Sequence, residues 1–166
     1  WVVAAKRLLA GIIDPGLPAG PSEVMILADD TVSGRLAAMD LLIEAEHGPD
    51  SSAWLVTPSE RVIEEALAAL PELWGKMTEQ RVEFSRTVLT GASGGIVLAR
   101  DMDDACAFVN DYAPEHLEIL STKPFDYLGD ITEASEILLG THTPVSIANF
   151  ALGPNAVLPT SKGANT

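Results

Sequence analysis

Short apolar runs rich in β-branched residues alternate along the chain with segments whose apolar residues recur at helical spacing. This alternation is typical of a mostly parallel β-sheet that is covered by helices on both faces. The sequence therefore predicts an α/β fold. The predicted strands are residues 23–27, 53–56, 95–98, 117–120 and 136–139.

The segments between these strands carry helix signals. Residues 31–47 place apolar side chains at helical spacing until Gly48-Pro49 ends the helix. Residues 57–60, Thr-Pro-Ser-Glu, read as a capping box with proline at the first helical position, and helical character continues in pieces to about residue 88. Asp101 can cap a further helix that runs to about residue 110.

Two regions do not follow the strand-helix alternation. Residues 1–10 read as a helix, and the turn-rich segment 11–21 that follows is typical of an interdomain connector. After Gly140 the chain contains three prolines and few periodic residues, which indicates a structured loop region and not a sixth repeat. The predicted sheet is therefore Rossmann-like but incomplete.

The charge of the chain excludes several classes of partner. Ten basic side chains against 24 acidic ones give a formal net charge of -14. Such a charge repels phosphate backbones and anionic lipid headgroups, so we expect neither nucleic acid nor a membrane surface as a partner. No apolar run approaches the roughly 20 residues that are needed to span a bilayer.

The single cysteine, Cys106, cannot form an internal disulfide and lies in an apolar helical stretch. We expect it to be a small buried hydrophobe in a protein of the reducing cytoplasm. No signal segment opens the chain. The chain begins at Trp1 and ends at Thr166, and both ends look cut, so we expect an internal fragment of a larger multidomain protein.

Glu44 and His47 are the first candidates for a metal site. They stand at positions i and i+3 of a predicted helix, so both side chains project from one face within reach of one ion. Carboxylate oxygen and imidazole nitrogen are zinc ligands. Two such residues also fit an ordinary pair on a helix surface, and the spacing alone leaves both interpretations open.

Glu115 and His116 form a second pair, in Tyr-Ala-Pro-Glu-His at the junction of a helix with the following strand. Neighbouring carboxylate and imidazole groups can perform two proton-transfer tasks. A solvent-exposed turn with two polar residues is the alternative. Because parallel sheets bind ligands beyond the carboxyl ends of their strands, we expect the chemistry in the segments just after those ends or on the loops that face them.

Three further segments carry weaker signals. Ser22 follows a tight Gly-Pro turn that could present its hydroxyl to a ligand. Residues 91–95, Gly-Ala-Ser-Gly-Gly, match the G-x-S-x-G pattern of hydrolases, but the nucleophile elbow needs a strand before the serine and a helix after it, and here the order is reversed. His142 has no motif context and is expected to be exposed.

Taken together, the order and spacing of four motifs resemble the histidinol dehydrogenase family over essentially the whole chain. The motifs are A-G-P-S-E-V, E-H-G-P-D-S, Y-A-P-E-H-L and G-P-N-A-V-L-P-T. The resemblance implies a zinc-dependent and NAD-dependent enzyme that works as a homodimer. Such an enzyme oxidises a primary alcohol through an aldehyde to a carboxylate, and the family substrate is L-histidinol.

The resemblance also implies roles for individual residues. His116 would take the proton of the alcohol, and Glu115 would activate the water that attacks the aldehyde. Zinc would be bound by Glu44, His47 and Asn149. The substrate would contact Ser22, Glu44, His47, His116 and Asn149.

The family pattern further implies a division of the chain. Residues 1–20 would be the edge of, or a linker from, a preceding nucleotide-binding domain, and residues 21–166 the catalytic domain. The residues that contact NAD would lie upstream of Trp1, so no cofactor-binding residue is expected here. The last zinc ligand, a histidine, would lie beyond Thr166 and reach the site across the dimer interface.

The sequence departs from the family at the metal site. Glu44 stands where the family has glutamine, and an ungapped alignment puts Asn149 where the family has aspartate. One change adds a negative charge and the other removes one, which argues for a rearranged zinc site. A binding module that kept the fold and lost the chemistry is the alternative.

The substrate wall departs as well. Ala156 stands where histidinol-specific members have a histidine, and Phe150 and Leu152 replace a tyrosine and a serine. Losing polar partners weakens discrimination for a polar substrate. A paralogue that acts on another small alcohol, such as a sulfonated propanediol, therefore stays open.

Overall fold

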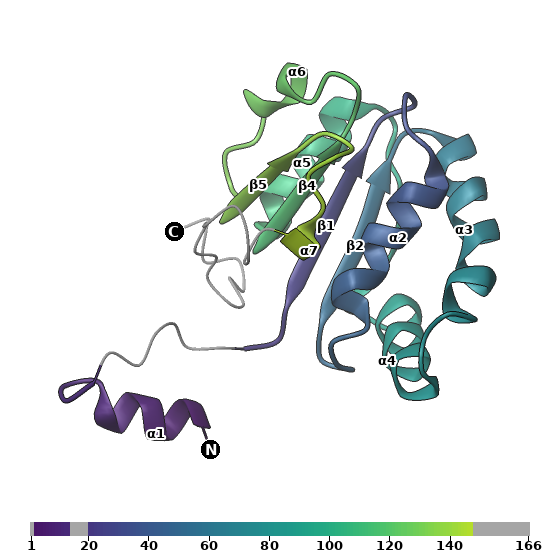
Figure 1. The fold of residues 1–166 in the computed structure, drawn as a ribbon. Coiled ribbons are helices and arrows are strands. Elements are labelled where there is room, and N and C mark those ends of the chain that lie inside the picture. Colours follow the sequence, from purple (N-terminus) through teal and green to yellow (C-terminus); the bar gives the residue numbers. More distant parts are fainter. Residues whose placement is uncertain (1, 14–19, 148–166) are drawn as a thin grey trace.

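The computed structural model describes residues 2–13 and 20–147 (Figure 1). All strands run parallel in one sheet, in the order β3-β2-β1-β4-β5. The bounds are β1 Glu23–Ala28, β2 Ser52–Thr57, β3 Gly94–Leu98, β4 His116–Leu120 and β5 Glu136–Leu139. The predicted parallel, Rossmann-like sheet is confirmed, and every predicted strand agrees to within about one residue at each end.

Helices cover both faces of this sheet (Figure 1). One face carries α2 (Gly34–Ala45), α3 (Glu60–Trp74) and α4 (Glu79–Thr90), and the other carries α5 (Met102–Tyr112). Shorter helices are α1 (Val2–Leu9), α6 (Phe125–Leu128) and α7 (Val145–Ile147). In the part of the chain that the structure describes, no helix combines the length and the apolar character needed to cross a bilayer.

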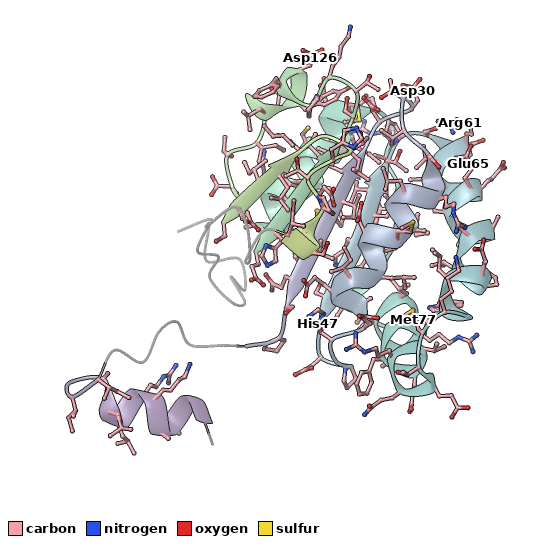
Figure 2. All side chains as sticks on the ribbon, in the orientation of Figure 1. Asp30, His47, Arg61, Glu65, Met77 and Asp126 are labelled. Carbon is pink, nitrogen blue, oxygen red and sulfur yellow. The ribbon has the colours of Figure 1, made fainter. Side chains whose placement is uncertain are left out.

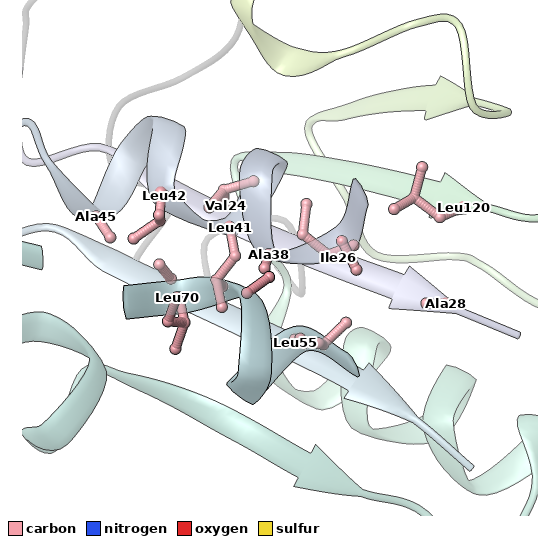
Figure 3. Packing of buried hydrophobic residues seen from close by; sticks show 14 of the residues in the cluster. Val24, Ile26, Ala28, Ala38, Leu41, Leu42, Ala45, Leu55, Leu70 and Leu120 are labelled. Atoms are coloured by element: carbon pink, nitrogen blue, oxygen red, sulfur yellow. The ribbon is translucent and has the colours of Figure 1, made fainter. Parts of the chain in front are cut away.

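The packing of the central strand β1 explains why all its residues after Glu23 are apolar. Val24 and Ile26 pack into the cluster beneath α2, where Leu41 is fully buried (Figure 3). Met25 and Leu27 point the other way and pack into the cluster beneath α5. Because successive side chains of a strand alternate between faces and both faces are covered, no position in β1 tolerates a solvated side chain.

The start of α3 differs from the prediction. Thr57 was expected to cap this helix with Pro58 at its first position, but Thr57 is the last residue of β2. Ser59 is the cap, because its hydroxyl accepts a 3.4 Å hydrogen bond from the backbone N–H of Val62. The Thr57 hydroxyl instead accepts from the Ser59 N–H at 3.1 Å and shapes the turn between strand and helix.

Gly34, the first residue of α2, lets α2 and α3 approach closely. A Cβ atom at this position would lie 2.1 Å from the carbonyl oxygen of Val62 and 2.8 Å from the backbone nitrogen of Ala66. Backbone atoms cannot move aside as a flexible side chain can. We expect Gly34→Ala to lower the free energy of unfolding of the full-length protein by about 1–3 kcal/mol, measured by urea denaturation.

Gly129→Ala is the matched control for this substitution. No atom lies within 4 Å of a Cβ built at Gly129, and its φ of -69° suits any residue. The control should therefore change stability by less than about 0.5 kcal/mol. Equal effects of the two substitutions would contradict the close approach of α2 and α3.

Candidate active site

The predicted site residues gather at the amino ends of the strands. Ser22 directly precedes β1, Glu115 directly precedes β4, and His116 is the first residue of β4. His47 lies at the same end of the sheet, opposite the end marked by Asp30 (Figure 2). These candidate residues therefore do not lie beyond the carboxyl ends of the strands, where they were expected; Ser22 and Glu115 precede strands and His116 opens one.

The carboxyl edge is filled by the protein's own polar groups. Asp29, at the end of β1, accepts a 2.6 Å hydrogen bond from the Ser121 hydroxyl, at the point where the strand order reverses between β1 and β4. The N-terminus of α2 is also occupied, because the Gly34 N–H donates to the Glu65 carboxylate at 2.8 Å. A helix N-terminus that is already paired with a carboxylate is closed to phosphate.

Ser22 and His47 share a shallow pocket. Its volume is about 390 Å³, and it is lined by Gly20, Pro21, Ser22, His47, Asp50 and Ser51. The main chain holds its two sides together, since the Ser52 N–H donates to the Ser22 carbonyl at 2.9 Å. The structure thus brings together two residues that were predicted from separate motifs.

The His47 ring is oriented in a way that suits a metal ligand. Nδ1 lies 2.7 Å from the Ile43 carbonyl oxygen, which can only accept, so Nδ1 carries the proton. With Nδ1 as the donor, the ring lone pair that can bind a metal is on Nε2, on a side chain that is 53% exposed. A histidine that donates its other N–H to a carbonyl is the usual form of a metal-bound imidazole.

Glu44 fits the same interpretation. Its side chain is buried, and its Oε2 atom lies 3.4 Å from Nδ1 of His47 but accepts no hydrogen bond from any residue the structure describes. A buried oxygen without a donor is suited to a cation. Within residues 2–13 and 20–147, however, no group of three or more His, Cys, Asp or Glu side chains could hold a metal ion. Glu44 and His47 are therefore at most part of a ligand set.

Glu115 and His116 are buried, and the alternative of a solvent-exposed turn is wrong. His116 is 1% exposed and Glu115 is 0% exposed. Nε2 of His116 lies 2.9 Å from Oε1 of Glu115, while Oε2 of Glu115 accepts a 3.1 Å hydrogen bond from the Glu23 N–H. Because Glu23 follows Ser22, this hydrogen bond connects the Glu115–His116 pair to the segment that lines the pocket of Ser22 and His47.

A third carboxylate completes the surroundings of the ring. Glu136, the first residue of β5, hydrogen-bonds to Nδ1 of His116. Burial acts to lower the pKa of His116, but the negative charges and hydrogen bonds of Glu115 and Glu136 outweigh it and raise the pKa to about 9. The ring therefore carries a proton on both nitrogens at neutral pH.

The loop that precedes Glu115 and His116 contains one unusual backbone conformation. Ala113 ends α5 in the left-handed region, with φ 55° and ψ 65°. A non-glycine residue adopts this conformation at a cost of about 1 kcal/mol, and it is favoured here because the Ala113 N–H still bonds to the Val109 carbonyl at 2.8 Å. The tight turn brings Glu115 and His116 directly onto the start of β4.

Asp40 and Glu118 form a buried acidic pair under α2. Glu118 is 1% exposed, and neither of its oxygens accepts a hydrogen bond within the described ranges. Burial and, to a smaller extent, the charge of Asp40 raise the pKa of Glu118 to about 9, and burial raises the pKa of Asp40 to about 6. Glu118 is therefore uncharged at neutral pH.

This raised pKa predicts a pH-dependent stability. The pKa of the Glu118 carboxyl is 4.5 in the unfolded chain and about 9 in the folded protein, so the folded protein binds the proton more tightly. The free energy of unfolding therefore falls as the pH rises from 4.5 to about 9. From pH 4.5 to pH 7 the loss is on the order of 3 kcal/mol. Glu118→Gln should remove that loss, whereas the exposed control Glu64→Gln should not, in urea denaturation of the full-length protein at pH 5, 7 and 9.

Other predicted residues fall into two groups. Cys106 is buried, and burial raises the pKa of its thiol to about 11, while His142 is exposed; both are as predicted. Residues 91–93 form the turn between α4 and β3, and Gly94 and Gly95 open β3, so the serine follows a helix and precedes a strand and is no nucleophile elbow. The positions outside the described residues are Asn149, Phe150, Leu152 and Ala156.

Comparison with known proteins decides the family. The family model described as histidinol dehydrogenase matches residues 1–166. The chain belongs to the histidinol dehydrogenase family. A histidinol dehydrogenase homolog of Cereibacter sphaeroides is 74% identical over 166 residues, which are 100% of this chain and 38% of that protein. A histidinol dehydrogenase of Synechocystis is 54% identical over 157 residues, 95% of this chain and 36% of that protein.

A solved structure agrees with the fold. The crystal structure of histidinol dehydrogenase from Elizabethkingia anophelis matches with a TM-score of 0.84 at 31% sequence identity, over 100% of this chain and 38% of that one. The chain thus spans less than two fifths of the histidinol dehydrogenases that it matches. The resemblance stated from the four motifs is confirmed.

The sequence did not reveal the other buried carboxylates of this domain. Glu136, Glu118 and Asp40 lie in no recognised motif. One signal was available for Glu136, since an acidic residue that opens an apolar strand is unusual. Its partner could not be inferred, because the register between β4 and β5 is set by the fold and not by either segment alone.

Proposed function

We propose that the full-length protein is a zinc- and NAD-dependent dehydrogenase that oxidises a primary alcohol to a carboxylate in two hydride transfers. The overall reaction is R–CH₂OH + 2 NAD⁺ + H₂O → R–COO⁻ + 2 NADH + 3 H⁺. One observation carries the proposal: the buried Glu115–His116 pair is bonded to the backbone of Glu23, next to Ser22. Membership of the histidinol dehydrogenase family supports it.

His116 is the residue proposed to take the proton from the substrate hydroxyl. Its Nε2 atom lies 2.9 Å from the Glu115 carboxylate, so the substrate hydroxyl replaces Glu115 at that nitrogen. The ring must first lose a proton, because its pKa is raised to about 9 by the two carboxylates that outweigh its burial. Activity should therefore rise toward alkaline pH.

Glu115 is the residue proposed to act in the second oxidation. Once it has left Nε2, its carboxylate can accept a proton from the water that attacks the aldehyde. The 3.1 Å hydrogen bond from the Glu23 N–H keeps the other oxygen in place. The two oxidations thus use adjacent groups, in the order alcohol to aldehyde and aldehyde to carboxylate.

Glu44, His47 and Asn149 are the proposed zinc ligands. The free Nε2 of His47 and the unpaired oxygen of Glu44 fit such a role. A bound zinc ion would fix the substrate and stabilise negative charge that develops on its oxygen. The remaining ligand and the residues that contact NAD would come from parts of the homodimer beyond this chain, and we propose a cytoplasmic location.

The substrate is proposed to be a small primary alcohol, either L-histidinol or a related compound such as a sulfonated propanediol. Relatives at 74% and 63% identity carry the name histidinol dehydrogenase homolog, whereas those at 54% and 41% are called histidinol dehydrogenase. The changes at Phe150, Leu152 and Ala156 agree with a different pocket wall. These observations favour a paralogue with its own substrate.

Steady-state rates of the full-length protein test the proposal. NAD⁺ is supplied with histidinol in one series and with 2,3-dihydroxypropane-1-sulfonate in the other, and two NADH per substrate consumed are expected with the true substrate. Zinc is measured after dialysis. If the protein retains no zinc and reduces no NAD⁺ with any alcohol, it is a binding module that kept the fold, and the proposal is wrong.

A further inference from the structure

Glu136 faces His116 across two neighbouring strands. The two residues are Cα partners in the parallel register of β4 and β5, and each is the first residue of its strand. Paired residues project their side chains from the same face of a sheet, close enough for direct contact. The Glu136 carboxylate accordingly hydrogen-bonds to Nδ1 of the ring.

The main chain fixes Glu136 relative to the acid-base pair. Its N–H donates to the Glu115 carbonyl at 2.9 Å, and the Ser135 N–H donates to the Pro114 carbonyl at 3.0 Å. These bonds extend the ladder of β4 and β5 beyond the strands. The backbones of Glu115, His116 and Glu136 are therefore held in a fixed register, which keeps the Glu136 side chain within reach of the ring.

The burial of Glu136 argues against a purely structural role. The residue is 6% exposed, and its Oε1 atom has no hydrogen-bond donor among the described residues. Removing a carboxylate from water costs free energy that an ion pair often fails to recover, and apolar residues at such positions are frequently as stable or more stable. Buried charges of this kind cluster at functional sites.

The two ring nitrogens have different partners. Glu115 contacts Nε2, the nitrogen that the proposed reaction uses, and Glu136 contacts Nδ1. The nitrogen that keeps its proton is set by the stronger fixed acceptor. We propose that Glu136 is a positioning residue for His116, which holds the Nδ1 proton so that Nε2 receives the proton of the substrate hydroxyl.

This inference rests on the proposed dehydrogenase function and deepens it. A negative charge at Nδ1 stabilises the imidazolium that forms when the alcohol loses its proton, so it makes His116 a stronger base. The ring is faced by Glu115 and by Glu136. The other acidic side chains on elements packed around it are Glu23 on β1, Asp40 and Glu44 on α2 and Glu118 on β4.

Glu136→Gln in the full-length enzyme tests the role, because the amide keeps the shape and removes the charge. We expect the pH at which kcat/KM levels off to fall by at least about one unit and the alkaline plateau of kcat to fall about tenfold, since a weaker base transfers the proton more slowly. KM should stay within about threefold. Glu136→Ala also loses the orientation, and its plateau should fall about 10- to 100-fold.

Glu118→Gln is the matched control. Glu118 lies two residues further along β4, on the same face as His116, and is equally buried, but neither of its oxygens hydrogen-bonds to the ring or to any other described residue. In Glu118→Gln, kcat/KM should level off at the same pH as in the wild type. An unchanged pH profile in Glu136→Gln, or the same shift in Glu118→Gln, overturns the proposal.

A readout without turnover separates this proposal from the proposed function. Full-length protein with ¹⁵N-labelled histidine is titrated by NMR, and the His116 signals are assigned by their absence in His116→Asn. We expect the His116 titration to move to lower pH in Glu136→Gln, with Nδ1 protonated in the neutral wild-type ring. Identical titrations overturn the role of Glu136. If the titrations differ as expected but the wild type forms no NADH, only the proposed dehydrogenase function is overturned.

Discussion

Replacing His116 with asparagine is expected to lower kcat/KM for alcohol oxidation by about 10²- to 10⁴-fold, because the reaction then lacks its proton acceptor. The wild type should show kcat/KM rising about tenfold per pH unit and levelling off near the raised pKa of about 9, whereas the variant should lose this dependence. Initial rates of NADH formation between pH 6 and about 10 measure both effects.

Two further variants show whether this loss is specific. His142→Asn removes an exposed histidine and should leave the rates and the pH profile unchanged. Glu115→Gln should retain the first oxidation and slow the second, so that one NADH is formed rapidly and the aldehyde accumulates and can be trapped with a hydrazine. An unaltered pH profile in His116→Asn would assign the proton transfer to another group.

Loss of zinc is the second large effect that we expect. His47→Ala removes the nitrogen whose orientation is fixed by the Ile43 carbonyl, and it should weaken zinc binding about 100-fold or more and abolish turnover in the absence of added metal. Zinc per protomer after dialysis is the measurement, with activity before and after chelation as the second. Glu44→Ala should lose zinc as well.

The exchanged charges of Glu44 and Asn149 allow a sharper design. If these two residues compensate, Glu44→Gln and Asn149→Asp should each weaken zinc binding or alter its pH dependence, and the double variant should restore it. Glu46→Ala is the control, since Glu46 is a neighbour on the helix that pairs with Arg81 on the surface. Full zinc content in Glu44→Ala would show that this carboxylate is no ligand.

Much of the fold was predictable because burial leaves a strong pattern. The central strand β1 is buried along its whole length, and from Val24 to Ala28 it is a continuous apolar run. The cap of α3 was placed wrongly because Thr57 and Ser59 are both good caps, and only the length of β2 decides between them. The local sequence does not determine the residue at which β2 ends.

From the residues alone the site was predictable only as separate motifs, and the family resemblance was needed to place Ser22, His47 and His116 in one site. The edge of the sheet was not predicted, since a general rule about parallel sheets pointed to the carboxyl ends of the strands. Glu136 was missed because its role depends on the register between two strands that are 20 residues apart in the sequence. Nothing in either segment encodes that pairing by itself.

The closure of the carboxyl edge by Asp29, Ser121 and Glu65 has a consequence for how this domain can be altered. In random mutagenesis, the effect of a variant should depend on the edge of the sheet at which it lies. Variants at the carboxyl edge, around residues 29–33 and 121–124, should change expression and thermal tolerance. Variants at the amino edge, around residues 20–23, 44–51 and 113–116, should change turnover. The same separation makes the carboxyl edge the place to attach a reporter or a designed loop without disturbing the reaction.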